Sequence, residues 1–292
     1  MLAFAPAVQA SPEAVYFVGN SFTWDSSPAT RVPSLSGELG VSLTVGHHIN
    51  CGATLNDIWI DPADTCVASP APFGTFDDAL PNFEWSAVTL QPFNDALGGD
   101  SGAVNRIGQF IEAARSGGLN ADTRFYVYSG WPAPWNDPNF DYSAAWERAY
   151  DPANTSTTWT RDYFDQVMQG LAGDGNGEAL MIPVGEVLYE LDQRARAGLL
   201  PGVDSANDLY RDELHLNNIG GYAASLTVVS TLWGESPIGL TDGTNMSPEL
   251  SLAVQQAVWD VVRAHPYTGI PEPAGVAGTG AGLLLLLKRR RA

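Results

Sequence analysis

Short apolar runs alternate along the chain with segments whose apolar residues recur at helical spacing. Five runs are rich in β-branched and aromatic residues and end at turn residues, which is typical of buried strands. They lie at residues 14–18, 41–45, 87–90, 124–128 and 179–184. Helical patterns occupy residues 28–39, 102–115, 142–150, 160–171, 186–197, 217–233 and 247–264. Because strands that alternate with helices pair in parallel and are covered on both faces, the pattern predicts an α/β fold with a five-stranded parallel sheet.

The carboxyl ends of the predicted strands are the expected place for a functional site. Right-handed crossovers bring these ends to one edge of a parallel sheet, and ligands bind there near the point where the strand order reverses. Ser21, the loop that contains Gly52, Asn94 and Trp131 each follow the end of a predicted strand. We therefore expect these four residues to converge.

The first strand stops at a glycine that is followed closely by a serine. Gly19 permits a sharp exit, Asn20 tolerates unusual backbone angles, and Ser21 stands where the next helix begins. Unsatisfied N–H groups and the helix dipole favour negative charge at such a position, which suits a nucleophile whose reaction forms an oxyanion. A serine there is equally typical of an ordinary helix N-cap. This stretch alone leaves both interpretations open.

A serine nucleophile needs a base within hydrogen-bond reach and a carboxylate that orients the base. Only one of the four histidines, His215, has a carboxylate at a suitable spacing, in Asp212-Glu213-Leu214-His215. Within one turn of chain, Asp212 can accept from Nδ1 of His215 and leave Nε2 facing Ser21. The alternative is a surface Asp-His pair at a helix start.

An oxyanion hole needs two or three preorganised donors. The candidates are the backbone N–H groups of Ser21 and Gly52 and the side-chain amide of Asn94. Gly52 lets the backbone approach a ligand closely. Asn94 has a competing interpretation as the cap of the helix after the third strand.

These blocks, taken in chain order, resemble the SGNH (GDSL-type) serine hydrolases. The corresponding residues are Gly19-Asn20-Ser21-Phe22-Thr23, Gly52, Asn94-Asp95 and Asp212-x-x-His215. The resemblance implies a flavodoxin-like three-layer α/β/α sandwich and ester hydrolysis without a metal or cofactor. It also implies Ser21 as nucleophile, Asp212 and His215 as the other triad members, and Ser21, Gly52 and Asn94 as oxyanion donors.

Two positions depart from the family pattern. Asn20 stands where the family often has Asp, and Pro92 stands two residues before Asn94, where the family usually has Gly. Gln91 is the polar residue that could substitute for Asn94 in the oxyanion hole, so we count it among the candidate substrate-binding residues.

Other residues offer weaker signals for substrate or metal binding. Trp131 and Trp135 are candidates for a substrate-binding wall, although aromatic residues more often pack in the core. His47 and His48 lie in a predicted loop at residues 46–61. A metal there would need a third ligand that the sequence does not identify, so no metal site is predicted.

The charge of the chain excludes several partners. The formal net charge is -19, and the single lysine is Lys288. Such a surface repels nucleic acid and anionic membranes. The two cysteines, Cys51 and Cys66, fit one disulfide in an exported protein, with two separate thiols as the alternative.

Both ends of the chain have the composition of processing signals. Residues 1–10 are apolar and end in a small-residue pattern, which predicts the remainder of a secretory signal peptide. Pro271-Glu272-Pro273, a mostly apolar segment at residues 274–287 and Lys288-Arg289-Arg290-Arg291 resemble the PEP-CTERM sorting signal of Gram-negative bacteria. This resemblance implies an exosortase-like processing enzyme, a transient membrane contact through the tail, and export to the cell surface, matrix or medium.

The predicted organisation is therefore a residual signal peptide at 1–10, an SGNH hydrolase domain at 11–266 and a sorting tail at 267–292. The predicted function is an exported serine esterase that hydrolyses a small ester or an acylated carbohydrate, such as an O-acetylated one, through an acyl-enzyme. A catalytically silent carbohydrate-binding or matrix protein on the same fold is the first alternative. A metal-dependent hydrolase that uses His47 and His48 is the second.

Overall fold

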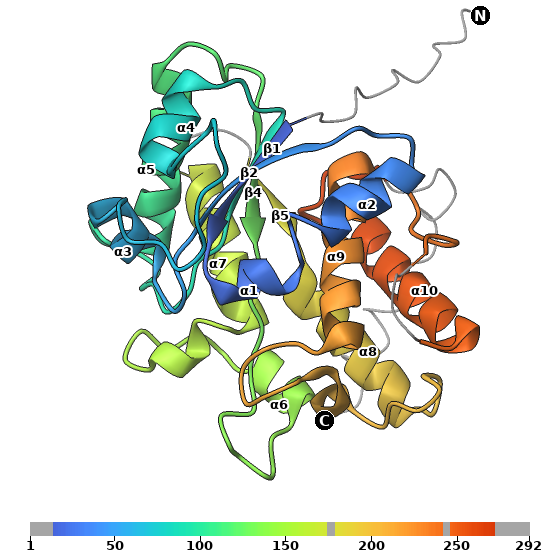
Figure 1. Ribbon diagram of the computed structural model, residues 1–292. Coiled ribbons are helices and arrows are strands. Elements are labelled where there is room, and N and C mark those ends of the chain that lie inside the picture. Colours follow the sequence, from blue (N-terminus) through green and yellow to red (C-terminus); the bar gives the residue numbers. More distant parts are fainter. Residues whose placement is uncertain (1–13, 174–178, 242–245, 272–292) are drawn as a thin grey trace, which may run out of the picture.

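Five parallel strands form the centre of the molecule in the computed structural model, which describes residues 14–173, 179–241 and 246–271 (Figure 1). The sheet order is β2-β1-β3-β4-β5 and every neighbouring pair is parallel. The strands are β1 (Ala14–Gly19), β2 (Thr44–Ile49), β3 (Ala87–Leu90), β4 (Arg124–Tyr128) and β5 (Ala179–Ile182). This is the flavodoxin-like order, whose reversal point lies between β1 and β3.

Helices cover both faces of the sheet, which makes three layers (Figure 1). One layer contains α3 (Leu55–Ile60), α4 (Phe76–Asn82), α5 (Ala103–Ser116) and α7 (Arg161–Gly173). The other contains α2 (Arg31–Glu38), α8 (Val184–Arg196), α9 (Asn218–Trp233) and α10 (Pro248–Ala264). The short helices are α1 (Ser21–Asp25), α6 (Tyr142–Trp146), η1 (Thr155–Thr157) and η2 (Ala206–Leu209). The structure confirms the predicted α/β fold with a five-stranded parallel sheet.

Burial of both faces explains the composition of the strands. Residues Val15 to Val18 of β1 are fully buried, because helices pack on each side of this interior strand. A sheet covered on both sides selects continuous apolar runs rather than alternating ones. Helix α9 is apolar around its whole circumference for the same reason, since it lies between the sheet and α10 and contacts both α2 and α8.

The second strand differs from its prediction. The predicted strand at 41–45 starts and ends too early, since β2 is Thr44–Ile49 and pairs with β1 through Val15 opposite Val45 and Gly19 opposite Ile49. The predicted loop at 46–61 is therefore partly strand, and it also contains α3. His47 and His48 are buried in β2, and burial lowers the pKa of both imidazoles. Neutral histidine is compatible with a buried strand, although its polarity makes the strand appear to stop at Gly46.

The two cysteines form the predicted disulfide, Cys51–Cys66. The bond follows the end of β2 and closes the chain across a separation of 15 residues. Cys66 also donates its backbone N–H to the carbonyl of Ile49 at 3.0 Å, so the segment returns to the strand from which it left. This crosslink holds the segment that contains Gly52.

The predicted signal peptide at 1–10 and residues 272–292 of the predicted sorting tail lie outside the described residues. Within the described ranges, no helix has the length and apolar character needed to cross a membrane.

Removal of the disulfide is expected to destabilise the fold by about 3 kcal/mol. The crosslink restricts the 15-residue segment in the unfolded chain, and without it the unfolded state gains conformational entropy. The Cys51→Ala/Cys66→Ala double variant and the oxidised wild type should be compared by urea unfolding. A difference below about 0.5 kcal/mol would contradict this expectation.

His265, which follows α10, makes the stability of the fold depend on pH. Burial lowers the pKa of His265 to about 4, despite the nearby Glu186 carboxylate that raises it. The backbone N–H of Tyr267 also points at Nδ1 at 3.4 Å, which fits a neutral ring. Because the folded pKa lies below the unfolded value of about 6.5, the unfolded chain binds more protons in this window and stability falls as the pH drops through it.

The His265→Gln variant is expected to lose this pH dependence. When the pH is lowered from ~7.5 to ~4.5, the unfolding free energy of wild type should fall by about 2 kcal/mol more than that of the variant. Asp95, with a pKa raised to about 6 by burial, changes stability in the opposite direction, but it is present in both proteins and cancels. Urea unfolding at the two pH values measures the shift, and an unchanged difference would refute it.

Candidate active site

The turn between β1 and α1 frees the hydroxyl of Ser21. Asn20, not Ser21, is the N-cap of α1, and its Oδ1 accepts from the N–H of Phe22 at 2.9 Å. Ser21 is the first residue of the helix, so its side chain is not used for capping. At Gly19 a Cβ would lie 2.2 Å from Oγ1 of Thr23 and 2.9 Å from Gln91. Only glycine fits this close approach, which explains the Gly-Asn-Ser order.

A hydrogen-bonded chain joins Ser21 to a histidine and an aspartate that are nearly 200 residues away in sequence. Nε2 of His215 lies 3.0 Å from Oγ of Ser21, and Nδ1 lies 3.0 and 3.1 Å from the two carboxylate oxygens of Asp212. These are the distances expected of a nucleophile, a base and the carboxylate that orients the base. The structure thus brings the three predicted residues together.

Asp212 is held in the ionised state that such a chain needs. Burial raises the pKa of Asp212, but hydrogen bonds from His215 and Leu214 outweigh that effect and hold the pKa below its ordinary value. The backbone N–H groups of Leu214 and His215 donate to Oδ1 at 2.9 and 2.7 Å. The carboxylate therefore shapes the loop and also orients the imidazole.

A second carboxylate, absent from the sequence prediction, attaches this loop to the helix that carries Ser21. Asp25 is the last residue of α1 and its side chain is 4% exposed. It accepts from the N–H of Leu216 and from Nη1 of Arg211, both at 2.8 Å. Because Arg211 and Leu216 flank His215, Asp25 fixes the position of His215 relative to Ser21. No local signal in the sequence points to this role, because Leu216 lies 191 residues away from Asp25.

The loops with the predicted oxyanion donors are connected by Asp95. Its buried carboxylate accepts from the N–H of Phe93 at 2.9 Å, and from those of Leu55 and Asn56 at 3.1 and 3.3 Å. The segment after β3, which contains Asn94, is thereby attached to the start of α3, three residues after Gly52.

Asn94 and Gly52 both have left-handed backbone conformations. Gly52 has φ 73° and Asn94 has φ 56°, and both are exposed. Asn94 does not cap the next helix, because the N-cap of α5 is Gly102. Both residues follow strands adjacent to β1, so they lie at the same edge of the sheet as Ser21. This placement is compatible with the predicted donor roles.

Gln91 supports the Ser21 turn from behind. It is 1% exposed, and its Oε1 accepts from the N–H of Asn20 at 3.0 Å and from the hydroxyl of Thr23 at 3.3 Å. Its Nε2 donates to the carbonyl of Pro92 at 3.0 Å. These bonds engage both ends of the amide within the protein, so the structure gives Gln91 a role in the fold rather than at a substrate.

The two predicted substrate-binding tryptophans have different environments. Trp131 is fully buried, stacks on Phe22 with ring centroids 4.2 Å apart, and donates Nε1 to the carbonyl of Leu214 at 3.3 Å. It therefore packs beneath α1 and the loop of His215. Trp135, in contrast, is 49% exposed.

His47 and His48 do not form a paired metal site. Successive residues of a strand point to opposite faces of the sheet, so two adjacent histidines in β2 cannot bind one ion together. His47 contacts the ring of Trp24, whereas Nδ1 of His48 faces the N–H of Phe76 at 3.4 Å. In the described part of the chain, no group of three or more His, Cys, Asp or Glu side chains is placed to bind a metal.

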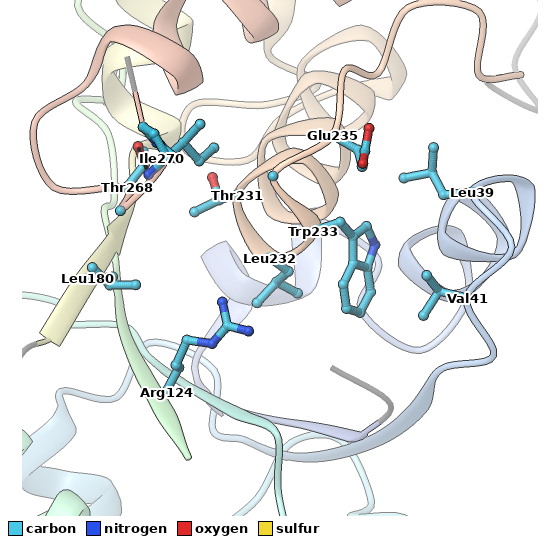
Figure 2. Close-up of a pocket in the computed structure, with 13 residues that line it drawn as sticks. Leu39, Val41, Arg124, Leu180, Thr231, Leu232, Trp233, Glu235, Thr268 and Ile270 are labelled. Atoms are coloured by element: carbon cyan, nitrogen blue, oxygen red, sulfur yellow. Dashed lines mark hydrogen bonds between the residues drawn. The ribbon is translucent and has the colours of Figure 1, made fainter. Parts of the chain in front are cut away.

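A cavity of about 510 Å³ lies at the opposite edge of the sheet (Figure 2). Its walls include Arg124 at the start of β4, Leu180 near the start of β5 and Trp233 at the end of α9. Ser21 follows the carboxyl end of β1, and His215 is bonded to it there, whereas this cavity lies at the amino ends of the strands. It is therefore not part of the candidate active site.

Comparison with known proteins supports the fold. No protein-family model matches the chain, and no curated protein matches it. Among solved structures, a DUF4886 family protein from Bacteroides uniformis is similar, with a TM-score of 0.60, 18% identity, and coverage of 85% of this chain and 94% of that chain. This likeness shows a shared α/β fold.

Two further structures have lower TM-scores. LAE5, an α/β hydrolase enzyme from the metagenome of Lake Arreo, has a TM-score of 0.48 and 13% identity, over 78% of this chain and 97% of that chain. A GDSL-like lipase from Bacteroides thetaiotaomicron has a TM-score of 0.39 and 12% identity, over 77% and 92%.

Loss of the Asp25 carboxylate is expected to slow the reaction of Ser21 with a fluorophosphonate probe about 100-fold, because a misplacement of the base by about 1 Å has an effect of that size. Asp25→Ala removes the anchor for Leu216 and Arg211, whereas Asp25→Asn keeps one acceptor and should recover part of the rate. Asp122→Ala, at an exposed site, is the control. Equal labelling rates for folded Asp25→Ala and wild type would contradict the positioning role.

Proposed function

We propose that the protein is an exported carboxylic ester hydrolase of SGNH type. The observation that carries this proposal is the hydrogen-bonded chain from Asp212 through His215 to Ser21. A serine at the start of a helix, with a base and an orienting carboxylate in reach, is the arrangement that acyl transfer requires. The four ordered sequence blocks support the same assignment.

The reaction starts with proton transfer from Ser21 to His215. Nε2 of His215 takes the hydroxyl proton while Oγ attacks the ester carbonyl, and the carbonyl oxygen becomes an oxyanion. The N–H groups of Ser21 and Gly52 and the amide of Asn94 stabilise this charge. His215 then returns the proton to the leaving alcohol, and an acyl-enzyme remains on Ser21.

Water completes the cycle in the second half of the reaction. His215 takes a proton from the water, the resulting hydroxide attacks the acyl carbonyl, and the tetrahedral intermediate releases the carboxylic acid as Ser21 regains its proton. Asp212 keeps the imidazole in the correct tautomer and stabilises the imidazolium that forms in both halves. No metal or cofactor takes part in this scheme.

Export and processing belong to the same proposal. The Pro-Glu-Pro tail with its arginine cluster supports recognition by an exosortase-like enzyme and a transient membrane contact. The Cys51–Cys66 disulfide is compatible with an oxidising compartment, since disulfides persist mainly in exported proteins.

The Ser21→Ala variant is expected to lose at least ~1000-fold in kcat on p-nitrophenyl acetate, because no other group can form the acyl-enzyme. Asp212→Asn should lower kcat ~10,000-fold, because the carboxylate holds His215 in the tautomer that accepts the proton of Ser21. Ser116→Ala, an exposed serine at the end of α5, is the matched control.

Mass spectrometry after treatment with a sulfonyl fluoride should locate the adduct on Ser21. If Ser21→Ala hydrolyses the ester as fast as wild type, the proposed function is wrong. An inactive wild type that still binds oligosaccharides would instead favour the catalytically silent carbohydrate-binding protein.

A further inference from the structure

We propose that Trp135 is a stacking platform for the neutral sugar ring of the substrate, which makes the protein an esterase for acylated neutral carbohydrate. This inference rests on the proposed function and adds its substrate class. It separates Trp135 from Trp131, which is buried and has no free ring face.

The indole of Trp135 is rigidly supported on one side. It stacks on Trp159, with centroids 5.2 Å apart and an interplanar angle of 22°, and Trp159 stacks on Phe93 at 5.3 Å and 21°. Trp159 and Phe93 are buried, at 5% and 6% exposure, whereas Trp135 is 49% exposed. A supported and exposed aromatic ring offers a flat apolar surface with little loss of conformational freedom on binding.

This aromatic stack is attached to the candidate active site at both ends. At the outer end, the N–H of Trp135 donates to the carbonyl of Glu213 at 2.9 Å, and Nδ2 of Asn136 donates to the Glu213 carboxylate. Glu213 lies between Asp212 and His215 in sequence. At the inner end, Phe93 packs edge-on against Phe22, the residue after Ser21, at 5.2 Å and 75°. A ring on Trp135 is therefore presented beside the loop that carries the base.

The backbone at this position is held in an unfavourable conformation. Trp135 has φ 46° and Asn136 has φ 62°, so two consecutive residues other than glycine are left-handed. A bulky side chain rarely adopts this conformation, because its Cβ approaches the carbonyl oxygen. Such strain persists where the surrounding structure enforces it, and it is concentrated at functional sites. The bonds to Glu213 are the contacts that enforce it here.

The neighbouring groups favour a neutral, hydroxyl-rich ligand. The Glu213 carboxylate accepts from the Asn136 amide beside Trp135, and Asp137 and Asp212 are near neighbours of these residues in sequence. Negative charge at this place repels an anionic ring such as a uronate. The carboxylates and the Asn136 amide suit hydroxyl groups better than an alkyl chain.

The test compares a sugar ester with a small ester in the same variants. Trp135→Ala should lower the ratio of kcat/KM for acetylated xylotriose to kcat/KM for p-nitrophenyl acetate about 10-fold, mainly through KM for the sugar ester. Trp135→Phe should keep the ratio within about 3-fold of wild type, because the ring face remains. Ile60→Ala, at an exposed apolar site, is the control and should leave the ratio unchanged.

Calorimetry supplies a readout that does not need catalysis. Xylotetraose should bind Ser21→Ala, and binding should weaken about 10-fold in Ser21→Ala/Trp135→Ala. An equal loss of kcat/KM for the sugar ester and the small ester in Trp135→Ala would overturn the inference. A wild-type preference for acetylated oligogalacturonate over acetylated xylotriose would also overturn it, as would a larger loss of kcat/KM in Trp135→Ala for p-nitrophenyl octanoate than for the sugar ester. If wild type hydrolyses no ester but xylotetraose still binds through Trp135, the proposed function fails while the platform stands.

Discussion

One buried asparagine connects the three strand ends on which the candidate site depends. Asn20 is fully buried and uses its backbone and both ends of its amide. Its Oδ1 caps α1 through Phe22, its Nδ2 donates to the carbonyl of Ala53 at 3.0 Å, and its backbone N–H donates to Gln91 at 3.0 Å. The segments after β1, β2 and β3 are thus joined at one residue. An aspartate at position 20 could not donate to Ala53, which gives a physical reason why this chain has Asn where the SGNH pattern that it resembles often has Asp.

The same constraint explains how a short helix can hold Ser21 in a fixed position. A five-residue helix is unstable in isolation, and α1 has no N-terminal acid or C-terminal base to support it. Asn20 holds its first turn and Asp25 joins its last residue to the loop of His215. Phe22, between them, stacks on buried Trp131. The position of Ser21 is therefore determined by long-range contacts on three sides rather than by helix propensity.

Features with a local pattern in the sequence could be predicted, whereas features that depend on contacts between distant segments could not. The parallel sheet was predictable because apolar periodicity encodes it. The disulfide was predicted from two cysteines together with the signs of export, and the Ser-His-Asp chain from the spacing of Asp212 and His215 together with the resemblance carried by the ordered blocks. The position of β2 was not, since two histidines interrupt an apolar pattern and only pairing with β1 shows that they are buried. Asp25 was missed because a carboxylate on a helix has no local sign of a partner 191 residues away. Likewise, composition alone could not separate buried Trp131 from exposed Trp135.

The charges around His215 show why Asp212, rather than Asp25, is the carboxylate that orients it. Both lie near the imidazole, but burial raises the pKa of Asp25, whereas the pKa of Asp212 is lowered. Arg211 lies between them, with Nη1 2.8 Å from Asp25 and Nε 3.7 Å from Asp212, and it reduces the repulsion that two close carboxylates would otherwise have. Asp25 is thus held in place by its own partners, and the half-exposed Asp212, in direct contact with Nδ1, remains ionised to stabilise an imidazolium. Two carboxylates thus support His215 in different ways: buried Asp25 holds its loop in place, and half-exposed Asp212 interacts with the imidazole itself.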